Sequence, residues 1–470
     1  MGLADVVLIL FVPIALVVSR SMPRVQATSL VVIAGSLFLP DRVALDLPGV
    51  PSLDKEAITY FSAFAGAAAA SRLGSPRHWV GPELTLSLLI VLAIAITVLT
   101  NQDPSESGGK LEPGFWIQDL VSQSLDIVIY TWLPFFVGRV LIRTGDDLRI
   151  LLRAIVLGGL AYGALATVEV LLSLPFRSFQ FSCRLFAVCY VPTIRWGTPQ
   201  PVLFMENPLS LAMFLATAAL AAAGLLRIAA LPIGRGRSRF VQALMLGAVV
   251  LCKNAAAIAY AVSLSAVSAT LSTRRTVALA TLLSSFVMLY PLARFADLFP
   301  WEELTDMASA INEERMISLY GRFWEEDFVM SQMGDHLWFG WGTIDRVPDA
   351  MNVKVIELNG AVGGDGGIDP YWVIIMGAFG VVGLELRFAL LLLPVFVAHW
   401  TFRRHSSPET KVLIATVAVI VAVRAIDLLP NGSWSNLPLF LSGALYRVSR
   451  ERHGSISKSL SQRVGHHRRP

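Results

Sequence analysis

Charged residues are scarce in this chain. Asp, Glu, Lys and Arg make up 15% of its 470 residues, whereas a soluble globular domain usually carries about a quarter. Apolar residues make up 55%, and the mean hydropathy is +0.63. The apolar residues are gathered into runs such as 84–99 and 390–400. This composition excludes an ordinary soluble domain and predicts a membrane protein.

The apolar runs predict helices. A helix of about 20 apolar residues crosses a bilayer, and backbone groups in lipid must be satisfied within the segment. The strands of a membrane β-barrel give a weaker, alternating pattern that is absent here. We therefore predict an all-α polytopic membrane protein with about 12–14 transmembrane helices. Thirteen spans are expected, near 3–19, 27–40, 57–70, 83–100, 125–142, 151–174, 208–226, 240–253, 255–271, 276–293, 371–398, 411–429 and 434–446.

Basic residues set the expected topology. The first 19 residues have neither a basic start nor a small-residue cleavage site, so they are interpreted as a retained helix and not a signal peptide. The run 240–271 is long for one helix and short for two. Splitting it at Lys253 and Asn254 puts every basic cluster on one side, which the positive-inside rule makes cytoplasmic. The formal charge of +4 thus reflects membrane topology and does not indicate a nucleic-acid partner.

The opposite, periplasmic side is expected to carry a large loop. The predicted divisions are a transmembrane bundle at 1–293, the loop at 294–370, C-terminal helices at 371–446 and a basic cytoplasmic tail at 447–470. Pro300 stands at a helix-start position, and apolar residues then recur at helical spacing. The loop is therefore expected to hold two amphipathic helices lying along the outer membrane face. The glycine-rich strip 359–369 leads from this loop into the next span.

Cysteine is nearly absent as well. Cys183 and Cys189 share the exterior loop 175–207, where they either form a disulfide or remain free thiols. No Cys and His spacing suggests a zinc site. Phosphate-binding glycine loops, metalloprotease helices and nucleophile elbows are also missing.

Cations at the outer ends of the predicted helices are the first candidates for chemistry. They are Arg195, Lys253, Arg322 and Arg346. Arginine forks and lysine charges suit a diphosphate, and several together would stabilise a leaving diphosphate. The alternative is that each pairs with a nearby acid or reaches toward lipid headgroups.

Two further residues are candidates for acid–base chemistry. Asp369, just before Pro370 and the next span, is interpreted either as a general base or as the N-cap of that helix. His336 stands among aromatic residues, where a histidine is more often structural, and catalysis is the alternative. The neighbouring acids Glu325, Glu326 and Asp327 are expected to form a solvated helix face. No role follows from the sequence for the buried acids Glu169 and Asp427.

An ordered series of segments resembles a known family. The segments are LPGVPSLDK (47–55), LTNQDP (99–104), LPFFVGRVLI (133–142), RWGTPQPVLFMENPLSLAMFLA (195–216), LCKNAAAIAYA (251–261), GRFWEEDFVMSQMGDHLWFGWG (321–342), DPYWVIIMGAFGVVGL (369–384) and LPNGSWSNLPLFLSGAL (429–445). Together with the large exterior loop, they resemble the O-antigen ligase and O-antigen polymerase superfamily of integral-membrane glycosyltransferases.

The resemblance implies a site as well as a fold. Members transfer a glycan from undecaprenyl diphosphate to a hydroxyl without a metal, using exterior arginines and a base near the end of the large loop. Arg322 matches the family arginine before the tryptophan. Lys253 stands where many relatives have arginine, and Asp369 stands where the ligases have a His-Asn pair. The last departure favours a polymerase-type subgroup over a ligase.

The sequence therefore predicts a polysaccharide polymerase of the bacterial inner membrane with its site facing the periplasm. It would act on undecaprenyl-diphosphate-linked glycans, with no cofactor and with a flippase and a chain-length regulator as partners. A ligase that moves the finished glycan to another acceptor is the first alternative. A flippase or other transporter is the alternative from a different class, although no internal repeat supports it.

Overall fold

The computed structural model describes residues 2–46, 51–75, 79–107, 109–176, 179–230, 234–310, 313–348 and 368–451. Its regular structure is almost entirely helical. The helices are α1 (Leu3–Ser21), α2 (Arg24–Phe38), α3 (Lys55–Ala69), α4 (Pro82–Thr100), α5 (Ile117–Ile127), η2 (Val128–Trp132), α6 (Leu133–Leu141), α7 (Gly145–Phe176), α8 (Phe181–Phe186), α9 (Pro208–Arg227), α10 (Gly234–Leu251), α11 (Ala255–Thr270), α12 (Thr273–Phe295), α13 (Trp301–Ser309), α14 (Glu313–Gln332), η3 (Gly334–His336), η4 (Ile344–Arg346), α15 (Tyr371–Thr401), η6 (Phe402–Arg404), α16 (Pro408–Asp427) and α17 (Leu437–Ser449). Two short hairpins pair β1 (Ser105–Ser107) with β2 (Lys110–Glu112) and β3 (Ile194–Arg195) with β4 (Thr198–Pro199).

The all-α polytopic membrane fold is confirmed. Seven helices in the described part of the chain are long and apolar enough to cross a membrane, and α2 and α11 are shorter apolar helices. Each of the thirteen predicted spans coincides with a helix, the fifth of them with the continuous unit α5–η2–α6 (Ile117–Leu141). The run 240–271 is split as predicted, since α10 ends at Leu251 and the side chain of Asn254 caps α11.

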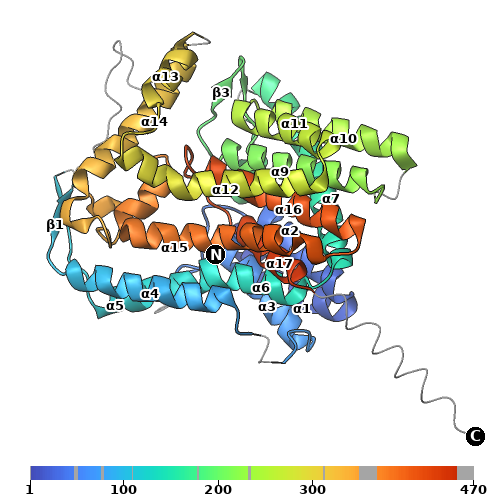
Figure 1. Ribbon diagram of the computed structural model, residues 1–470, viewed down its shortest axis with the longest axis horizontal. Coiled ribbons are helices and arrows are strands. Elements are labelled where there is room, and N and C mark those ends of the chain that lie inside the picture. The colour runs from blue at the N-terminus through green and yellow to red at the C-terminus, as the bar shows by residue number, and fades with distance from the viewer. Residues whose placement is uncertain are drawn as a thin grey trace, which may run out of the picture.

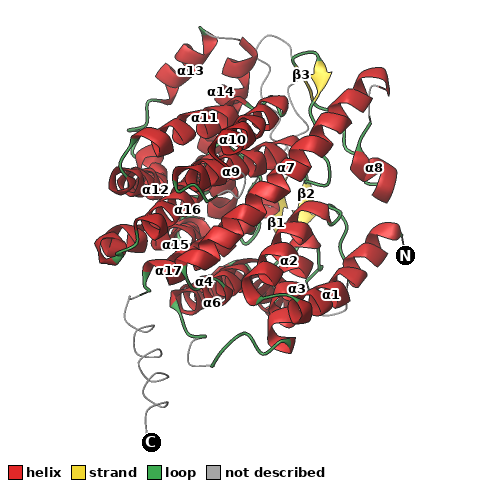
Figure 2. Cartoon of the chain, turned by 90° about the vertical axis from the view of Figure 1, so that its right-hand side faces the viewer, coloured by secondary structure: helices red, strands yellow, loops and turns green. Residues whose placement is uncertain are grey.

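The long helices lie side by side in one bundle. In Figure 1, α4, α12 and α15 run nearly parallel, and β1, α13 and α14 gather at the end where α4 and α12 finish and α15 begins. We call this the outer end. In the turned view of Figure 2, α1 and α12 lie on opposite sides, with α9 and α16 between them. Accordingly, 83% of an apolar 18-residue stretch of α9 is buried inside the bundle, against 22% of the corresponding stretch of α1.

Close backbone contact joins α6 to α17. A Cβ placed on Gly138 would lie 2.0 Å from the carbonyl oxygen of Phe440, and one on Gly443 would lie 2.0 Å from that of Phe135. Any larger residue would push the two helices apart. Small residues at helix contacts are typical of membrane bundles, where dispersion forces and close approach replace the hydrophobic effect.

Helix α15 is interrupted, which the sequence analysis missed. Gly380 has φ of 66°, and the backbone groups freed at this break bind the segment 337–342. Trp341 and Gly342 donate their backbone N–H groups to the carbonyls of Gly377 and Ala378 at 2.8 and 2.7 Å. Unpaired backbone groups at membrane depth cost several kcal/mol each, roughly. The inserted segment removes that cost and fixes the large loop against α15.

Basic loops from distant parts of the chain meet at the end opposite the outer end. Hydrogen bonds there join Arg24 to Asp147, Arg143 to the carbonyl of Arg72, Arg149 to Glu409, and Arg153 to the carbonyl of Ala230. This common end agrees with the predicted grouping of the basic clusters. By the positive-inside rule, this grouping predicts that the outer end faces away from the cytoplasm.

Reporter fusions test this orientation. Alkaline phosphatase fused after Gln332 should be active, and green fluorescent protein fused there should not fluoresce. After Ser407, alkaline phosphatase should be inactive and green fluorescent protein should fluoresce. The reason is that the reverse orientation would place the clustered basic loops outside the cytoplasm, against the positive-inside rule. Cytoplasmic activity after Gln332 would contradict the topology, and with it an extracytoplasmic site.

Candidate functional site

A buried carboxylate joins three helices at the outer end. Glu326 of α14 is 2% exposed and accepts hydrogen bonds from Arg294 Nε at 2.7 Å, Tyr290 Oη at 2.9 Å and Trp372 Nε1 at 2.9 Å. Tyr290 and Arg294 belong to α12, and Trp372 to the first turn of α15. Arg294 also binds Asp327 at 2.6 Å. The predicted solvated face was thus wrong for Glu326, because its partners lie on neighbouring helices that the sequence does not place.

Glu325 is buried as well, which is a second correction to the predicted solvated face. It is 5% exposed, and its carboxylate accepts the backbone N–H of Asp369 at 2.8 Å. Burial raises the pKa of Glu325 to about 7; the nearby Asp369 carboxylate adds to this shift, and the hydrogen bond from Asp369 N–H and the charge of Arg322 oppose it. Glu325 was not proposed as a site residue, although its spacing three residues after Arg322 on a helix was a usable signal.

The structure brings together Arg322 and Asp369, two of the predicted catalytic residues. Arg322 Nη2 lies 3.8 Å from Asp369 Oδ2, and the two side chains are 22% and 65% exposed. Arg322 Nε is buried without a hydrogen-bond partner. The expected N-cap role of Asp369 is wrong: Pro370 is the N-cap of α15, no side chain caps it, and Asp369 lies one residue too early.

His336 and Arg346 lie in a different part of the outer loop. His336 stacks on Trp341 with ring centroids 3.6 Å apart, and burial lowers its pKa. Arg346 is 3% exposed and donates to the backbone carbonyls of Trp341, Asp103 and Pro113. It thereby closes the end of α4 against η4. Within the described residues, the contacts of both side chains are structural, and their proposed roles in catalysis and diphosphate binding stay predictions.

Lys253 and Arg195 meet at the β3–β4 hairpin. Lys253, in the turn between α10 and α11, donates from Nζ to the carbonyls of Thr198 and Pro199 at 3.0 and 2.9 Å and to the Thr198 hydroxyl. Thr198 pairs with Arg195 across the hairpin. The Lys253 ammonium therefore fixes a loop to the bundle, and its role in diphosphate binding remains a prediction.

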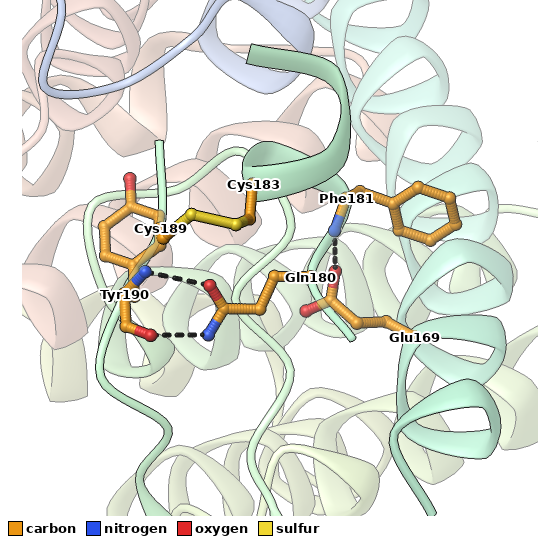
Figure 3. Close-up of a disulfide and its surroundings, with 6 residues drawn as sticks. All are labelled: Glu169, Gln180, Phe181, Cys183, Cys189 and Tyr190. Carbon is orange, nitrogen blue, oxygen red and sulfur yellow. Dashed lines mark hydrogen bonds between the residues drawn. A yellow bond between two sulfur atoms is a disulfide. The ribbon is translucent and has the colours of Figure 1, made fainter. Parts of the chain in front are cut away.

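The exterior loop after α7 is tied down by a disulfide and by Glu169. Cys183 and Cys189 are disulfide-bonded, which decides the alternative that the sequence left open (Figure 3). Just outside the ring closed by the disulfide, the Gln180 side chain binds both backbone groups of Tyr190. The Glu169 carboxylate, 2% exposed, accepts the backbone N–H groups of Phe181, Val202 and Leu203. Glu169 is thus an anchor for this loop.

The segment 428–436, between α16 and α17, lies against Asp369 and Tyr371. Asn431 accepts the N–H of Tyr371 at 3.4 Å, and Trp434 stacks on the Tyr371 ring at a centroid distance of 4.7 Å. A Cβ on Gly432 would lie 2.7 Å from the Asp369 carbonyl oxygen. Asp427 binds Asn431 at 2.8 Å and faces Arg424 at 3.3 Å, so this buried acid holds the segment in place.

A polar cavity opens on the other side of this segment. Its volume is about 360 Å³, and its lining comes from the start of α3, the segments before α3 and α9, Tyr130, and the segment 428–436. The lining residues are Asp41, Arg42, Val43, Ala44, Asp54, Lys55, Glu56, Tyr130, Met205, Glu206, Ser210, Gly432, Trp434, Ser435 and Asn436. Sequence analysis missed this cavity because its walls lie far apart in the chain.

An apolar groove of about 490 Å³ lies between α2 and α7. Leu37 and Phe38 line it at the outer end of α2, three to four residues before Asp41 of the polar cavity. Ala161 and Leu157 line its α7 wall. Among the residues that the structure describes, no group of His, Cys, Asp or Glu side chains could hold a metal ion.

The raised pKa values predict a fall in stability as pH rises. Unfolded Glu325 and Glu326 lose their protons near pH 4.5, whereas burial raises the folded pKa of each to about 7. The folded state therefore binds more protons between these values, and stability falls with rising pH through this window. The unfolding temperature in nanodiscs should drop from pH 5 to 7.5, and Glu325→Gln should reduce the drop. Glu302→Gln, on the exposed face of α13, is the matched control; an unchanged slope in Glu325→Gln would contradict the burial of Glu325.

No protein-family model matches the sequence, and no curated protein matches it. The resemblance to the O-antigen ligase and polymerase superfamily therefore remains a prediction from the sequence. What the fold does show is a multi-pass helical membrane protein with a pair of opposite charges, Arg322 and Asp369, at its outer end.

Proposed function

We propose that this protein is a membrane glycosyltransferase of the polymerase type. It transfers a glycan from undecaprenyl diphosphate to a hydroxyl of a lipid-linked repeat unit at the periplasmic face of the inner membrane. The observation that carries this proposal is the Arg322–Asp369 pair, in which a guanidinium with an unpartnered, buried Nε faces an exposed carboxylate beside a polar cavity.

Arg322 differs from the other outer cations in how its donors are used. Lys253 is bound to Thr198 and Pro199, Arg346 to backbone carbonyls, and Arg294 to Glu326 and Asp327. Among the described residues, Arg322 makes one long ion pair, and its Nε has no hydrogen-bond partner. A buried donor without a partner costs about 1–3 kcal/mol. A phosphate oxygen would accept a hydrogen bond from this donor and remove that cost, and an arginine guanidinium can bind a phosphate in a bidentate manner.

The proposed step is a direct displacement at the anomeric carbon of the donor. The acceptor hydroxyl oxygen forms a bond to this carbon, and the bond to the phosphate oxygen breaks. The diphosphate leaves with the electron pair, and Arg322 offsets its charge. The hydroxyl proton passes to the Asp369 carboxylate, with Glu325 behind it as a second proton acceptor because its pKa is about 7.

The groove between α2 and α7 supports a lipid-linked substrate. Its lining is mostly apolar, and it is built by two predicted membrane spans. Phe38, at its outer end, precedes Asp41 of the polar cavity by three residues. A polyprenyl chain in this groove would bury its CH₂ and CH₃ groups at about 0.8 kcal/mol per CH₂ if the alternative were water. The gain in free energy is smaller when the groove would otherwise hold lipid tails. The groove therefore contributes more to the position of the polyprenyl chain than to the affinity for it.

Substitution of the charge pair tests the transferase. Arg322→Ala should abolish polymer formation, because the leaving diphosphate loses its cation, and Arg322→Lys should retain part of it. Asp369→Asn should lower the rate by roughly two orders of magnitude or more, the usual contribution of a general base. The assay is polymer length and released undecaprenyl diphosphate, using purified protein in nanodiscs and a lipid-diphosphate-linked oligosaccharide.

Protein level and unfolding temperature of each variant provide the folding control. Wild-type polymer from Arg322→Ala would contradict the proposed role of this arginine. Release of undecaprenyl diphosphate with no polymer, restored by another hydroxyl acceptor, would indicate a ligase. Movement of the oligosaccharide across the bilayer without release of the diphosphate would indicate a transporter.

Filling the α2–α7 groove tests its role in the same assay. Ala161→Trp places a large side chain on the α7 wall and should raise the KM for a polyprenyl-linked donor several-fold. A donor with a short lipid chain should be affected much less, because it does not occupy the groove. Leu171→Trp, an exposed position on the same helix outside the groove, is the matched control. Equal effects on both donors would rule out the groove as the polyprenyl site.

A further inference from the structure

We propose that the polar cavity beside the segment 428–436 is the binding site for the acceptor sugar. Its ligand would be a hydroxyl-rich, uncharged or amino-bearing saccharide, not the diphosphate. This inference rests on the proposed function and deepens it, because it separates the place where the acceptor binds from the place where the donor's diphosphate binds.

The charge of the cavity walls is the first support. Four acids, Asp41, Asp54, Glu56 and Glu206, face only two cations, Arg42 and Lys55. Both cations are engaged by the protein. A diphosphate would meet an excess of carboxylates here, which disfavours its binding on electrostatic grounds. Sugar hydroxyls are donors that suit carboxylate oxygens.

Asp41 is paired with Lys55 and Asp54 caps α3, so Glu56 and Glu206 are the wall carboxylates that a ligand could use. Lys55 Nζ lies 2.6 Å from Asp41 Oδ2 and donates to the carbonyl of Phe204 at 2.9 Å. The Arg42 guanidinium lies over the Tyr190 ring at 4.6 Å. Glu56 accepts one long hydrogen bond, from Asn436 N–H at 3.4 Å. Its carboxylate therefore has unused acceptor capacity toward the cavity.

An unpartnered amide is the second, independent support. Asn436 lines the cavity and is 0% exposed, and in the part of the chain that the structure describes its side-chain Nδ2 has no hydrogen-bond partner. Its Oδ1 accepts from Trp434 Nε1 at 2.9 Å, so the orientation of the amide is fixed. Buried polar groups in native proteins are nearly always hydrogen-bonded. An oxygen of a bound sugar would supply the missing acceptor.

The position of the cavity agrees with a role for its ligand as acceptor. Trp434 and Gly432 line it, and these two residues also contact Tyr371 and the Asp369 carbonyl. A sugar in the cavity would thus lie directly beside the turn that carries the proposed base. The volume of about 360 Å³ lies at the lower end of the range for small-molecule sites, about 300–1,000 Å³.

Binding to an array of bacterial oligosaccharides tests this inference without requiring transfer. The purified full-length protein in detergent should bind a subset of the array. Glu56→Gln and Glu206→Gln, which keep size and remove charge, should each weaken that binding by about tenfold, equivalent to ~1.4 kcal/mol. Arg322→Ala should bind as the wild type does, because it acts on the diphosphate, and Glu302→Gln on α13 is the matched control for loss of a carboxylate.

Each other outcome overturns one of the two proposals. Wild-type protein that binds no glycan, or cavity variants that bind as tightly as the wild type, would overturn the acceptor site. Equal loss of binding in Arg322→Ala would also overturn it, since the two sites would then be one. Glycan binding that depends on Glu56 and Glu206, together with no release of undecaprenyl diphosphate by the wild type, would keep the cavity as a glycan site and overturn the transferase.

Discussion

The Glu326 carboxylate is the interaction on which the outer end depends. A buried ion from α14 would cost several kcal/mol without compensation, and here it is met by Arg294 and Tyr290 of α12 and by Trp372 of α15. Because these donors come from two different helices, the carboxylate fixes the rotation of α14 between them. Arg322 lies about one helical turn earlier on α14, and Asp369 lies three residues before Trp372. Their separation of 3.8 Å therefore follows from a contact that involves neither of them.

Three other charged residues of the outer end hold loops in place through hydrogen bonds to backbone groups. Glu169 accepts backbone N–H groups from the segments 179–181 and 202–203, Lys253 donates to carbonyls of the β3–β4 hairpin, and Arg346 donates to carbonyls at the end of α4. Loops near a bilayer lack the water that would otherwise satisfy their backbone groups, so charged side chains that are fully committed to peptide groups stabilise them. The same logic explains the break in α15, where the segment 337–342 supplies the partners that the helix loses. Arg322 differs from Lys253 and Arg346 in that its Nε has no hydrogen-bond partner among the described residues.

The sequence was sufficient for features that depend on local patterns. The lengths of the apolar runs predicted the transmembrane spans. The turn at Lys253 and Asn254 predicted the division of 240–271 into two helices, and the structure shows Asn254 capping the second of them. The helices of the large loop also followed from their periodicity. The same periodicity misled at Glu325 and Glu326, because it assigns charged residues of an amphipathic helix to the solvent-facing side. The structure instead buries Glu325, Glu326 and Val329. The break at Gly380 and the cavity could not be predicted, because the break depends on tertiary contacts with the segment 337–342 and the cavity walls come from segments far apart in the chain. The glycine-rich strip before Asp369 and the basic tail lie mostly outside the described residues.

Two polar regions of different charge lie on either side of the segment 428–436. On one side is Arg322, a cation with an unused donor; on the other is a cavity in which acids outnumber cations. A transfer between two glycans needs such a division, because its two substrates differ in the group that must be recognised, a diphosphate for one and a free hydroxyl for the other. If one pocket bound both groups, each substrate would compete for the other's place, and specificity would need a repulsive element to prevent it. The excess of carboxylates in the cavity is such an element against the diphosphate. In the transfer proposed above, the Asp369 carboxylate would accept the proton of the acceptor hydroxyl as the bond to the donor forms, because Gly432 and Trp434 of the cavity wall contact the turn that carries it.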